Sequence, residues 1–285
     1  PSAKTYNGSA QASGITCPTG STTGGDTSKT DKGTYAQTCT ANSGYKFSST
    51  CSVSWTINAR TVTITAPTAN SSTLTYSGSA QNLLATAGSC TTGGTMYWYS
   101  SNPTTSSTAP TFSTSSGWTT TAPTTTSYKG TNAGTYYIWY YCYVSDTTNN
   151  TGTGINTVKN ITKAINKKAS TASLNPTSGT LTYGTAGTST ITKETDGTLS
   201  CVSSDTSVAT CSVSGTTLTI TPVANTADGK TATITLKTTA GTNYAANDSL
   251  ATYEATVNRK TLTCPSSPSA KTYNGSAQAS GITCP

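Results

Sequence analysis

Residues 1–18 and residues 268–285 of this chain are identical, letter for letter (PSAKTYNGSAQASGITCP). Pro268, the first residue of the second copy, stands 267 positions after Pro1. An exact match of this length is too long for a local motif, and it indicates a tandem array with a period of 267 residues. Arrays are typical of spacers, stalks, fibres and multivalent binders, and rarely of catalysts. We therefore expect neighbouring copies of the same repeat, within one chain, to be the main partners of this segment.

The composition favours an all-β protein with a polar surface. Charged residues make up only 9% of the chain, whereas Tyr occurs 16 times and Thr alternates with aliphatic residues, as in Leu218–Thr221. Thr is β-branched and tolerates the solvent face of a strand. No long stretch keeps the 3.6-residue period of an amphipathic helix, and no apolar run reaches 18 residues. We expect no membrane span in this segment.

The charges and the missing His narrow the functional classes. The net charge of +7 comes from Lys and Arg that are scattered along the sequence, and their density is too low for a nucleic-acid-binding face. The absence of His excludes Ser-His-Asp and Cys-His nucleophile systems. Only Glu194 and Asp196 are carboxylates close in sequence, and they lie on a predicted turn rather than facing each other as in a glycosidase. We expect no catalytic residue, no metal site and no cofactor.

Three similar joints divide the period into modules. Each joint follows a β-like run and precedes another: Ile57-Asn58-Ala59-Arg60, Ile165-Asn166-Lys167-Lys168 and Val257-Asn258-Arg259-Lys260. They predict a first module at 1–60, a second at 61–166 with a long connection at 100–130, a third at 167–258, and the start of the next copy at 259–285. Because the joints are short and poor in Gly and Pro, we expect a stiff array.

The first and second modules share a pattern. Thr5–Gln11 (TYNGSAQ) matches Thr75–Gln81 (TYSGSAQ), and Gly33-Thr34-Tyr35 with Cys39 matches Gly134-Thr135-Tyr136 with Cys142. This pattern resembles bacterial Ig-like domains of the MBG (YDG-type) kind, over residues 1–60 and 66–166. The resemblance implies a β-sandwich and a surface role, and it implies no reaction.

The third module carries a different pattern over residues 169–258. Ser203–Thr210 (SSDTSVAT), Leu218–Pro222 (LTITP) and Ala232–Thr235 (ATIT) resemble the Big group of bacterial Ig-like domains. Those families occur in surface proteins, adhesins and phage structural proteins. Cys211 stands where that pattern usually has an aliphatic residue, and Cys201 lies ten residues before it, which suggests an added local disulfide.

Cysteine usage supports the repeat. The chain has nine Cys, but Cys284 is Cys17 of the next copy, so one period holds eight. An even number without His and without a CxxC pair favours disulfides formed in an oxidising, extracellular or cell-surface setting over zinc. Sequence alone does not fix the connectivity.

The Ig-like resemblance implies four pairings. The Cys-x7-Trp…Cys order is that of an Ig core, so Cys90–Cys142 is expected to bridge the two sheets beside Trp98. The module match then gives Cys17–Cys39, and Cys201–Cys211 is expected to close a short hairpin. Cys51 and Cys264 are left, each to be paired across neighbouring copies.

Strand parity predicts an outer aromatic face. Successive side chains of a strand point to opposite faces, so an inward Cys142 and an inward Trp98 leave six aromatics on the outside. These six are Tyr97, Tyr99, Tyr137, Trp139, Tyr141 and Tyr143. Monomers rarely leave such a patch open. Three interpretations compete: burial under the connection 100–130 with its Phe112, Trp118 and Tyr128, contact with another module or fibre, and a platform for glycan rings.

The sequence therefore predicts tandem immunoglobulin-like β-sandwiches with a mechanical role. We expect the structural repeat unit of an extracellular fibre, stalk or giant surface protein, stapled by disulfides. Two alternatives stay open at this point. One is a multivalent adhesin module that binds glycans or a host surface through its aromatics. The other is a filament subunit that associates laterally with other fibres.

Overall fold

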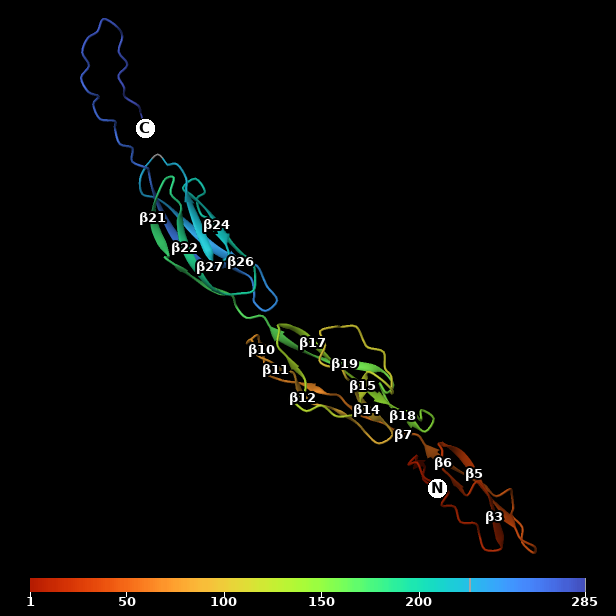
Figure 1. Ribbon diagram of the computed structural model, residues 1–285. Coiled ribbons are helices and arrows are strands. Elements are labelled where there is room, and N and C mark those ends of the chain that lie inside the picture. Colours follow the sequence, from red (N-terminus) through yellow and green to blue (C-terminus); the bar gives the residue numbers. More distant parts are fainter. Residues whose placement is uncertain (226, 285) are drawn as a thin grey trace. The chain divides into compact units, whose positions relative to one another are not determined.

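The computed structural model describes residues 1–225 and 227–284, and its regular elements in this part are all β-strands. The chain is an all-β protein of tandem immunoglobulin-like β-sandwiches, which confirms the predicted fold class. It divides into two compact units, Pro1–Asn166 and Lys167–Pro285, which are described separately here (Figure 1). The first unit contains the first and second modules, and the second unit contains the third module and residues 259–284.

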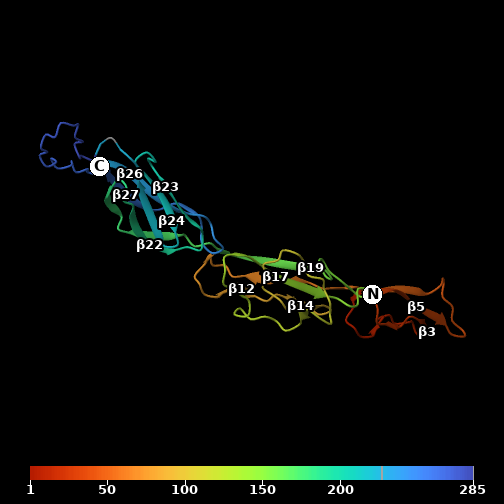
Figure 2. The same cartoon turned by 45° about the horizontal axis from the view of Figure 1, so that its top comes forward.

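The first module is built on one four-stranded sheet and one short strand pair. The sheet has the order β1-β6-β5-β3, and β2 pairs with β4. Figure 2 shows β5 and β3 of this sheet. Strand β1 runs parallel to the last strand, with Lys4 opposite Ile57, and the other neighbours are antiparallel. The bounds are β1 Lys4–Thr5, β2 Gln11–Ala12, β3 Ser21–Gly25, β4 Ser28–Lys29, β5 Gly33–Ala41 and β6 Ser52–Asn58.

The second module repeats this plan with more strands. Its main sheet has the order β10-β19-β17-β14-β15, and again the first of these strands is parallel to the last strand of the module, with Leu74 opposite Ile165. The sheet contains β10 Leu74–Thr75, β14 Thr95–Tyr99, β15 Trp118–Thr119, β17 Gly134–Tyr143 and β19 Val158–Asn166. Short pairs cover its inner face: β7 Arg60–Thr61 with β18 Asn150–Thr151, β8 Ile64–Thr65 with β13 Ser89–Cys90, β9 Thr68–Ala69 with β12 Leu84–Thr86, and β11 Gln81–Asn82 with β16 Lys129–Gly130.

The third module is a sandwich of two four-stranded sheets (Figure 1). One sheet has the order β20-β22-β25-β24, with bounds Thr171–Asn175, Gly187–Glu194, Thr217–Pro222 and Ala209–Ser214. The other has the order β21-β27-β26-β23, with bounds Ser178–Thr182, Asn247–Asn258, Lys230–Thr238 and Leu199–Ser203. Alternating Thr and aliphatic residues place one row of side chains inside and one in water, as period-2 patterning requires.

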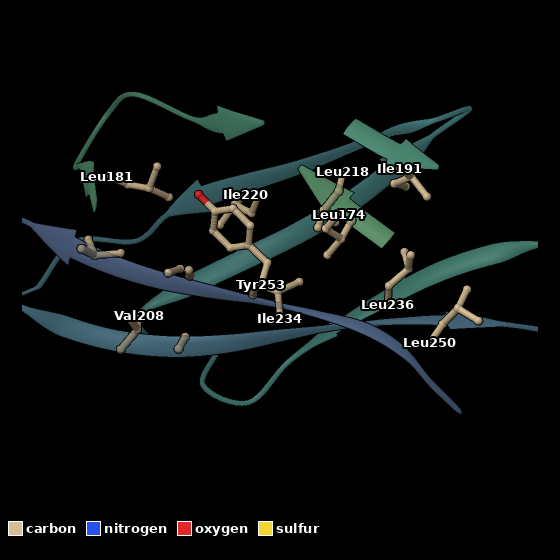
Figure 3. Close-up of a cluster of buried hydrophobic side chains, with 14 residues drawn as sticks. Leu174, Leu181, Ile191, Val208, Leu218, Ile220, Ile234, Leu236, Leu250 and Tyr253 are labelled. Carbon is tan, nitrogen blue, oxygen red and sulfur yellow. The ribbon is translucent and has the colours of Figure 1, made fainter. Parts of the chain in front are cut away.

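The core of the third module lies between its two sheets. Leu218 and Ile220 from β25 and Ile234 and Leu236 from β26 are fully buried, and Tyr253 from β27 is 2% exposed. Figure 3 shows these side chains pointing toward one another from strands of both sheets. Each fully buried aliphatic side chain stabilises the fold by about 1.5–3 kcal/mol relative to its exposed state.

All three modules share one backbone device at the end of their last strand. The amide N–H of a Tyr donates to the carbonyl of the joint Asn: Tyr6 to Asn58 at 2.8 Å, Tyr76 to Asn166 at 2.9 Å, and Tyr183 to Asn258 at 2.9 Å. A glycine with φ between +77° and +87° follows each Tyr within two residues, where a side chain would be strained. The matching segments Thr5–Gln11 and Thr75–Gln81 contain this Tyr and Gly in the first two modules, whereas in the third module Gly184 follows Tyr183 directly.

Candidate interaction surface and module joint

Strands β14 and β17 bring the predicted aromatic residues together. They pair antiparallel, with Tyr97 opposite Tyr141 and Trp98 opposite Tyr140. Cys142 and Trp98 point into the core of the second module with Met96 and Tyr140, as parity predicts. The outer aromatic face (Tyr97, Tyr99, Tyr137, Trp139, Tyr141 and Tyr143) lies on the opposite side of the same sheet.

The connection 100–130 covers this face. Phe112 stacks on Tyr141 with ring centroids 3.6 Å apart and planes within 6°, and Trp118 enters the sheet through β15 opposite Tyr99. As a result, Trp139 is only 4% exposed and Tyr141 only 9%. The other four aromatics of the face are partly buried against the same cluster. The connection therefore buries Trp139 and Tyr141 and leaves Tyr97, Tyr99, Tyr137 and Tyr143 partly exposed.

One residue of the connection lies elsewhere than expected. Tyr128 was expected to help cover the outer aromatic face, but it lies in the core with Leu83, Leu84 and Ile138. The reason is the return of the chain toward β16, where the Leu83 amide donates to the Tyr128 carbonyl at 2.9 Å. The expectation for Tyr128 was wrong because sequence position along a connection does not say which face the chain has reached.

Hydrogen bonds from Asn102 fix the connection to the sheet. Its side-chain amide donates to the Trp139 carbonyl at 2.8 Å, and its side-chain oxygen accepts from the Trp139 amide at 2.9 Å. The Trp139 indole Nε1 is the one buried side-chain polar atom without a hydrogen-bond partner in the part of the chain that is described. Burial also raises the pKa of Tyr141, and the neighbouring Tyr143 adds to this effect, so the Tyr141 phenol is neutral at physiological pH.

The structure forms three disulfides: Cys17–Cys39, Cys90–Cys142 and Cys201–Cys211. These are the three intramodular pairs named from the sequence. Cys201–Cys211 differs in one respect, because it does not close a hairpin. Cys201 lies on β23 and Cys211 on β24, and these strands belong to different sheets of the third module. The intervening residues cross from one sheet to the other, so this bond is an intersheet bridge.

Cys51 and Cys264 carry free thiols in the described chain, as does Cys284. Cys51 is half-buried and Cys264 is exposed. Their pairing across neighbouring copies stays a prediction.

The two carboxylates close in sequence serve the local structure. Glu194 accepts from the Lys168 ammonium at 2.6 Å, which lowers the pKa of Glu194, with a further contribution from the Tyr244 hydroxyl. Asp196 accepts the backbone amide of Asn243 at 2.7 Å and so holds the 239–246 turn. No group of three or more metal-ligating side chains occurs within residues 1–225 and 227–284. In the same residues, no helix is long and apolar enough to cross a membrane.

The joint between the first and second modules is a polar cluster that the sequence analysis missed. Asn149 is 6% exposed, and its side-chain amide donates to Asp31 at 2.9 Å and to Asp146 at 3.0 Å. Its side-chain oxygen accepts the Lys32 amide at 2.7 Å. A signal was present in the sequence, since Asp146–Asn150 (DTTNN) gathers residues whose side chains readily bond to backbone groups.

Arg60 ties the same joint to the second module. Its backbone amide donates to the Asn149 carbonyl at 2.9 Å, and its guanidinium Nε donates to Asn150 Oδ1 at 2.9 Å. The guanidinium also lies 5.3 Å from the ring centroid of Tyr6, a cation–π distance. Burial raises the pKa of Tyr6, and the neighbouring Asp146 carboxylate raises it further. Both modules therefore supply side chains to one hydrogen-bonded network.

Comparisons with known proteins give no family. No protein-family model matches the chain, and no curated protein matches it. Among solved structures, domains 4 and 5 of the S-layer protein SbsC are 19% identical, covering 44% of this chain and 65% of that chain at a TM-score of 0.25. The titin I-band fragment I67–I69 is 10% identical, covering 88% and 87% at a TM-score of 0.29. The four N-terminal Ig domains of Dscam1 isoform 6.44 are 14% identical, covering 79% and 54% at 0.29.

The chain spans less than two thirds of the first SbsC structures, at 65% of domains 4 and 5 and 32% of a longer SbsC structure. At these identities and TM-scores, the likeness says nothing about the partners or role of this chain.

Proposed function

We propose that this chain is the structural repeat unit of an extracellular fibre, stalk or large surface protein, and that it acts as a stiff spacer. The observation that carries the proposal is the joint between the first two modules. The Asn58 carbonyl accepts the Tyr6 amide of the first module, and the Arg60 amide donates to the Asn149 carbonyl of the second. Only Ala59 stands between the two hydrogen-bonded residues. Because a single residue separates these two hydrogen-bonded residues, the joint has little freedom to bend, unlike a flexible linker.

The exact duplication of residues 1–18 supports the same proposal, because it places the beginning of one period directly after the end of another. The intramodular disulfides add to it. Each removes conformational freedom from the unfolded module and stabilises it by typically 2–4 kcal/mol. Disulfides persist in oxidising environments, which supports an extracellular or cell-surface location.

The test uses chains with one, two and three consecutive copies of the 267-residue period. We expect each added copy to increase the maximum dimension, measured by small-angle X-ray scattering, by the same increment. Electron micrographs of the three-copy chain should show rods of one thickness. A maximum dimension that grows much more slowly than copy number, as in a compact particle, would contradict a spacer.

An adhesin that binds glycans or a host surface is the second candidate. It is favoured by the four partly exposed tyrosines of the outer aromatic face, Tyr97, Tyr99, Tyr137 and Tyr143. Tyr137 is the residue to change, because its ring is stacked 6.0 Å from Trp139 at the edge of the cluster. Glycan-array binding by the intact chain that disappears in Tyr137→Ala would favour the adhesin.

The matched control is Tyr45→Ala, which removes an exposed tyrosine of the first module. Equal loss in both variants would indicate nonspecific stacking. Concentration-dependent bundling of rods that Tyr137→Ala abolishes would instead favour lateral contact between filaments.

A further inference from the structure

Residues 1–60 contain no counterpart of β7, β8 and β9, the first strands of the second module. The last two long strands of each module can be aligned by their register. Gly33 pairs with Ile57 in the first module, and Gly134 pairs with Ile165 in the second. In the second module, β8 and β9 pair with residues 84–90 and close the side of the sandwich. Among the described residues, no strand pairs with Ile15–Cys17, the corresponding stretch of the first module.

The first strands of the second module seal its core beside the disulfide. Val62, which directly follows β7, is 1% exposed and packs with Met96, Trp98 and Cys142. Gly94 shows how closely Val62 approaches the bridge: a Cβ at this glycine would lie 2.8 Å from Cys142 Sγ and 2.9 Å from Val62 Cγ1. Ile64, two residues later, packs against the same cluster.

The interior of the first module lacks the counterpart of this seal. Its buried residues are Ser13, Gln37, Cys39, Trp55 and Ile57, two of which are polar. The Cys17–Cys39 bridge corresponds to Cys90–Cys142, although Cys39 lies two residues closer to the start of its strand than Cys142 does. Cys17 and Cys90 are both half-buried, and Cys39 is 6% exposed where Cys142 is 1% exposed.

The free Cys51 lies at the same uncovered place. The Cys39 amide donates to the Cys51 carbonyl at 2.9 Å, so Cys51 continues β6 at the level of the bridge. Parity with the buried Trp55 and Ile57 points the Cys51 side chain inward. In the second module the corresponding residue is Lys159, because Cys51 precedes Ile57 by as many residues as Lys159 precedes Ile165.

Lys159 has the first strand of its own module as a neighbour. A Cβ placed on Gly154 would touch the Lys159 ammonium and would lie 3.9 Å from Ile64 Cδ1. Ile64 lies opposite Cys90 in the β8–β13 pair. A residue at the place of Ile64 in the first module would therefore lie opposite Cys17, whose bridge partner Cys39 is hydrogen-bonded to Cys51.

Residues 258–264 carry the pattern of the missing strand. Asn258-Arg259-Lys260-Thr261-Leu262-Thr263-Cys264 matches Asn58-Ala59-Arg60-Thr61-Val62-Thr63-Ile64, and both segments begin at the joint Asn that accepts a Tyr amide. Leu262 stands at the place of Val62, and Cys264 stands at the place of Ile64. Leu262 is 62% exposed, whereas Val62 is 1% exposed. The large aliphatic side chain of Leu262 is thus exposed to water, whereas that of its counterpart Val62 is buried.

We propose that residues 260–264 of one copy form the first strand of the first module of a second copy. Leu262 then fills the core beside Cys17–Cys39, and Cys264 forms a disulfide with Cys51. The partner is the next copy along the array, so the placement rests on the proposed repeat function. Each copy would thus complete its neighbour's sandwich and lock it covalently.

The bond formation balances with an external disulfide as the oxidant. The thiols of Cys51 and Cys264 lose two protons and two electrons as their S–S bond forms. Oxidised glutathione takes these up and leaves as two molecules of reduced glutathione.

The experiment uses a chain of two consecutive copies, residues 1–267 followed by 1–285, equilibrated in glutathione redox buffer. Without the proposed bond, this chain has five free thiols: two Cys51, two Cys264 and the last Cys284. With it, three remain, and mass spectrometry of a non-reduced digest finds the Cys51 peptide joined to the Cys264 peptide. Five free thiols, or Cys264 joined equally to Cys51 and Cys284, would overturn the proposal.

A matched pair of variants tests the strand itself. Leu262→Asp places a carboxylate in the core of the neighbouring module and should lower the cross-linked fraction by about tenfold or more. Thr263→Asp, on the opposite face of the same strand, should leave the fraction unchanged. Equal effects of both variants would show that chance thiol encounter, and not strand insertion, forms the bond.

This result is separable from the spacer proposal. Rods that lengthen by a constant increment without the Cys51–Cys264 bond would support the spacer proposal and contradict the proposal that residues 260–264 form a strand of the next copy. A Cys51–Cys264 bond in chains that do not lengthen regularly would do the reverse.

Discussion

The side-chain amide of Asn149 donates to Asp31 Oδ1 at 2.9 Å, although the two residues are 118 positions apart. This bond joins the second module to the first, and Asn149 also bonds to the Lys32 amide and to Asp146. Because Asn149 is buried, water cannot readily replace the lost bonds when one member is removed. The joint is therefore the place where a single substitution tests stiffness.

Asn149→Ala should loosen this joint without unfolding either module. The change removes two amide donations and leaves the Lys32 amide without its acceptor, which costs about 1–3 kcal/mol of local stability. Hydrogen exchange at Lys32 should become faster, while exchange in the centre of β17 stays unchanged. Asn160→Ala, at an exposed position of β19, is the control and should leave Lys32 protected. Unchanged exchange in Asn149→Ala would show that the bond contributes nothing.

The joint should hold between two pH limits set by Asp146 and Tyr6. Hydrogen bonds from the Asn149 backbone and side chain lower the pKa of Asp146 from its usual 3.8. A lowered pKa means that the carboxylate stabilises the folded joint above pH 3.8, and that this contribution is lost as the pH falls through the folded pKa. Partial burial raises the pKa of Tyr6 from its usual 10.0, and the Asp146 carboxylate raises it further. The contribution of the neutral phenol is present below pH 10.0 and is lost as the pH rises through the folded pKa.

Hydrogen exchange at the Arg60 amide, corrected for the intrinsic pH dependence, measures both limits. Asp146→Asn should remove the acid limit and Tyr6→Phe the alkaline one. If both variants follow the pH profile of the unmodified chain, the titrating groups lie elsewhere.

Phe112→Ala should uncover the outer aromatic face. The Phe112 ring stacks on Tyr141 and makes edge contacts with Tyr97 and Trp118, so its loss removes about 1–3 kcal/mol of packing from a half-buried site. Quenching of tryptophan fluorescence by acrylamide should increase, because Trp118 loses its contact with the Phe112 ring. Thr105→Ala, exposed in the same connection, should leave quenching as it is. Equal quenching in all three chains would mean that the connection is held without Phe112.

The disulfides should differ in their contributions by the length of chain that they close. Cys90–Cys142 spans 52 positions and Cys201–Cys211 spans 10, so loop entropy predicts about 4 kcal/mol for the first and about 3 kcal/mol for the second. Double Cys→Ala variants of each pair, followed by urea unfolding of the corresponding unit, measure these values. A larger loss at Cys201–Cys211 would indicate that bridging two sheets matters more than loop length.

The aromatic strands show what a local sequence pattern can predict and what it cannot. Alternation along Tyr136–Val144 gave the correct face for each side chain, because a strand has only two faces and the inward Cys142 fixes the register. The same alternation could not say whether the outer side was open. That depended on Phe112, which lies 29 residues before Tyr141 and reaches it only through the path of the connection.

The sequence by itself determined the all-β class, the identity of residues 1–18 and 268–285 at an offset of 267, and the inward and outward rows of β14 and β17. These follow from identity at a fixed offset and from the two-residue period of the pleat, which are local properties of the chain. Only the tertiary structure decided what covers the outer aromatic face, which sheets Cys201 and Cys211 join, and how Asn149 meets Asp31. Each of these depends on the route that an irregular connection takes through space, and the energies that fix such a route come from partners far away in the sequence.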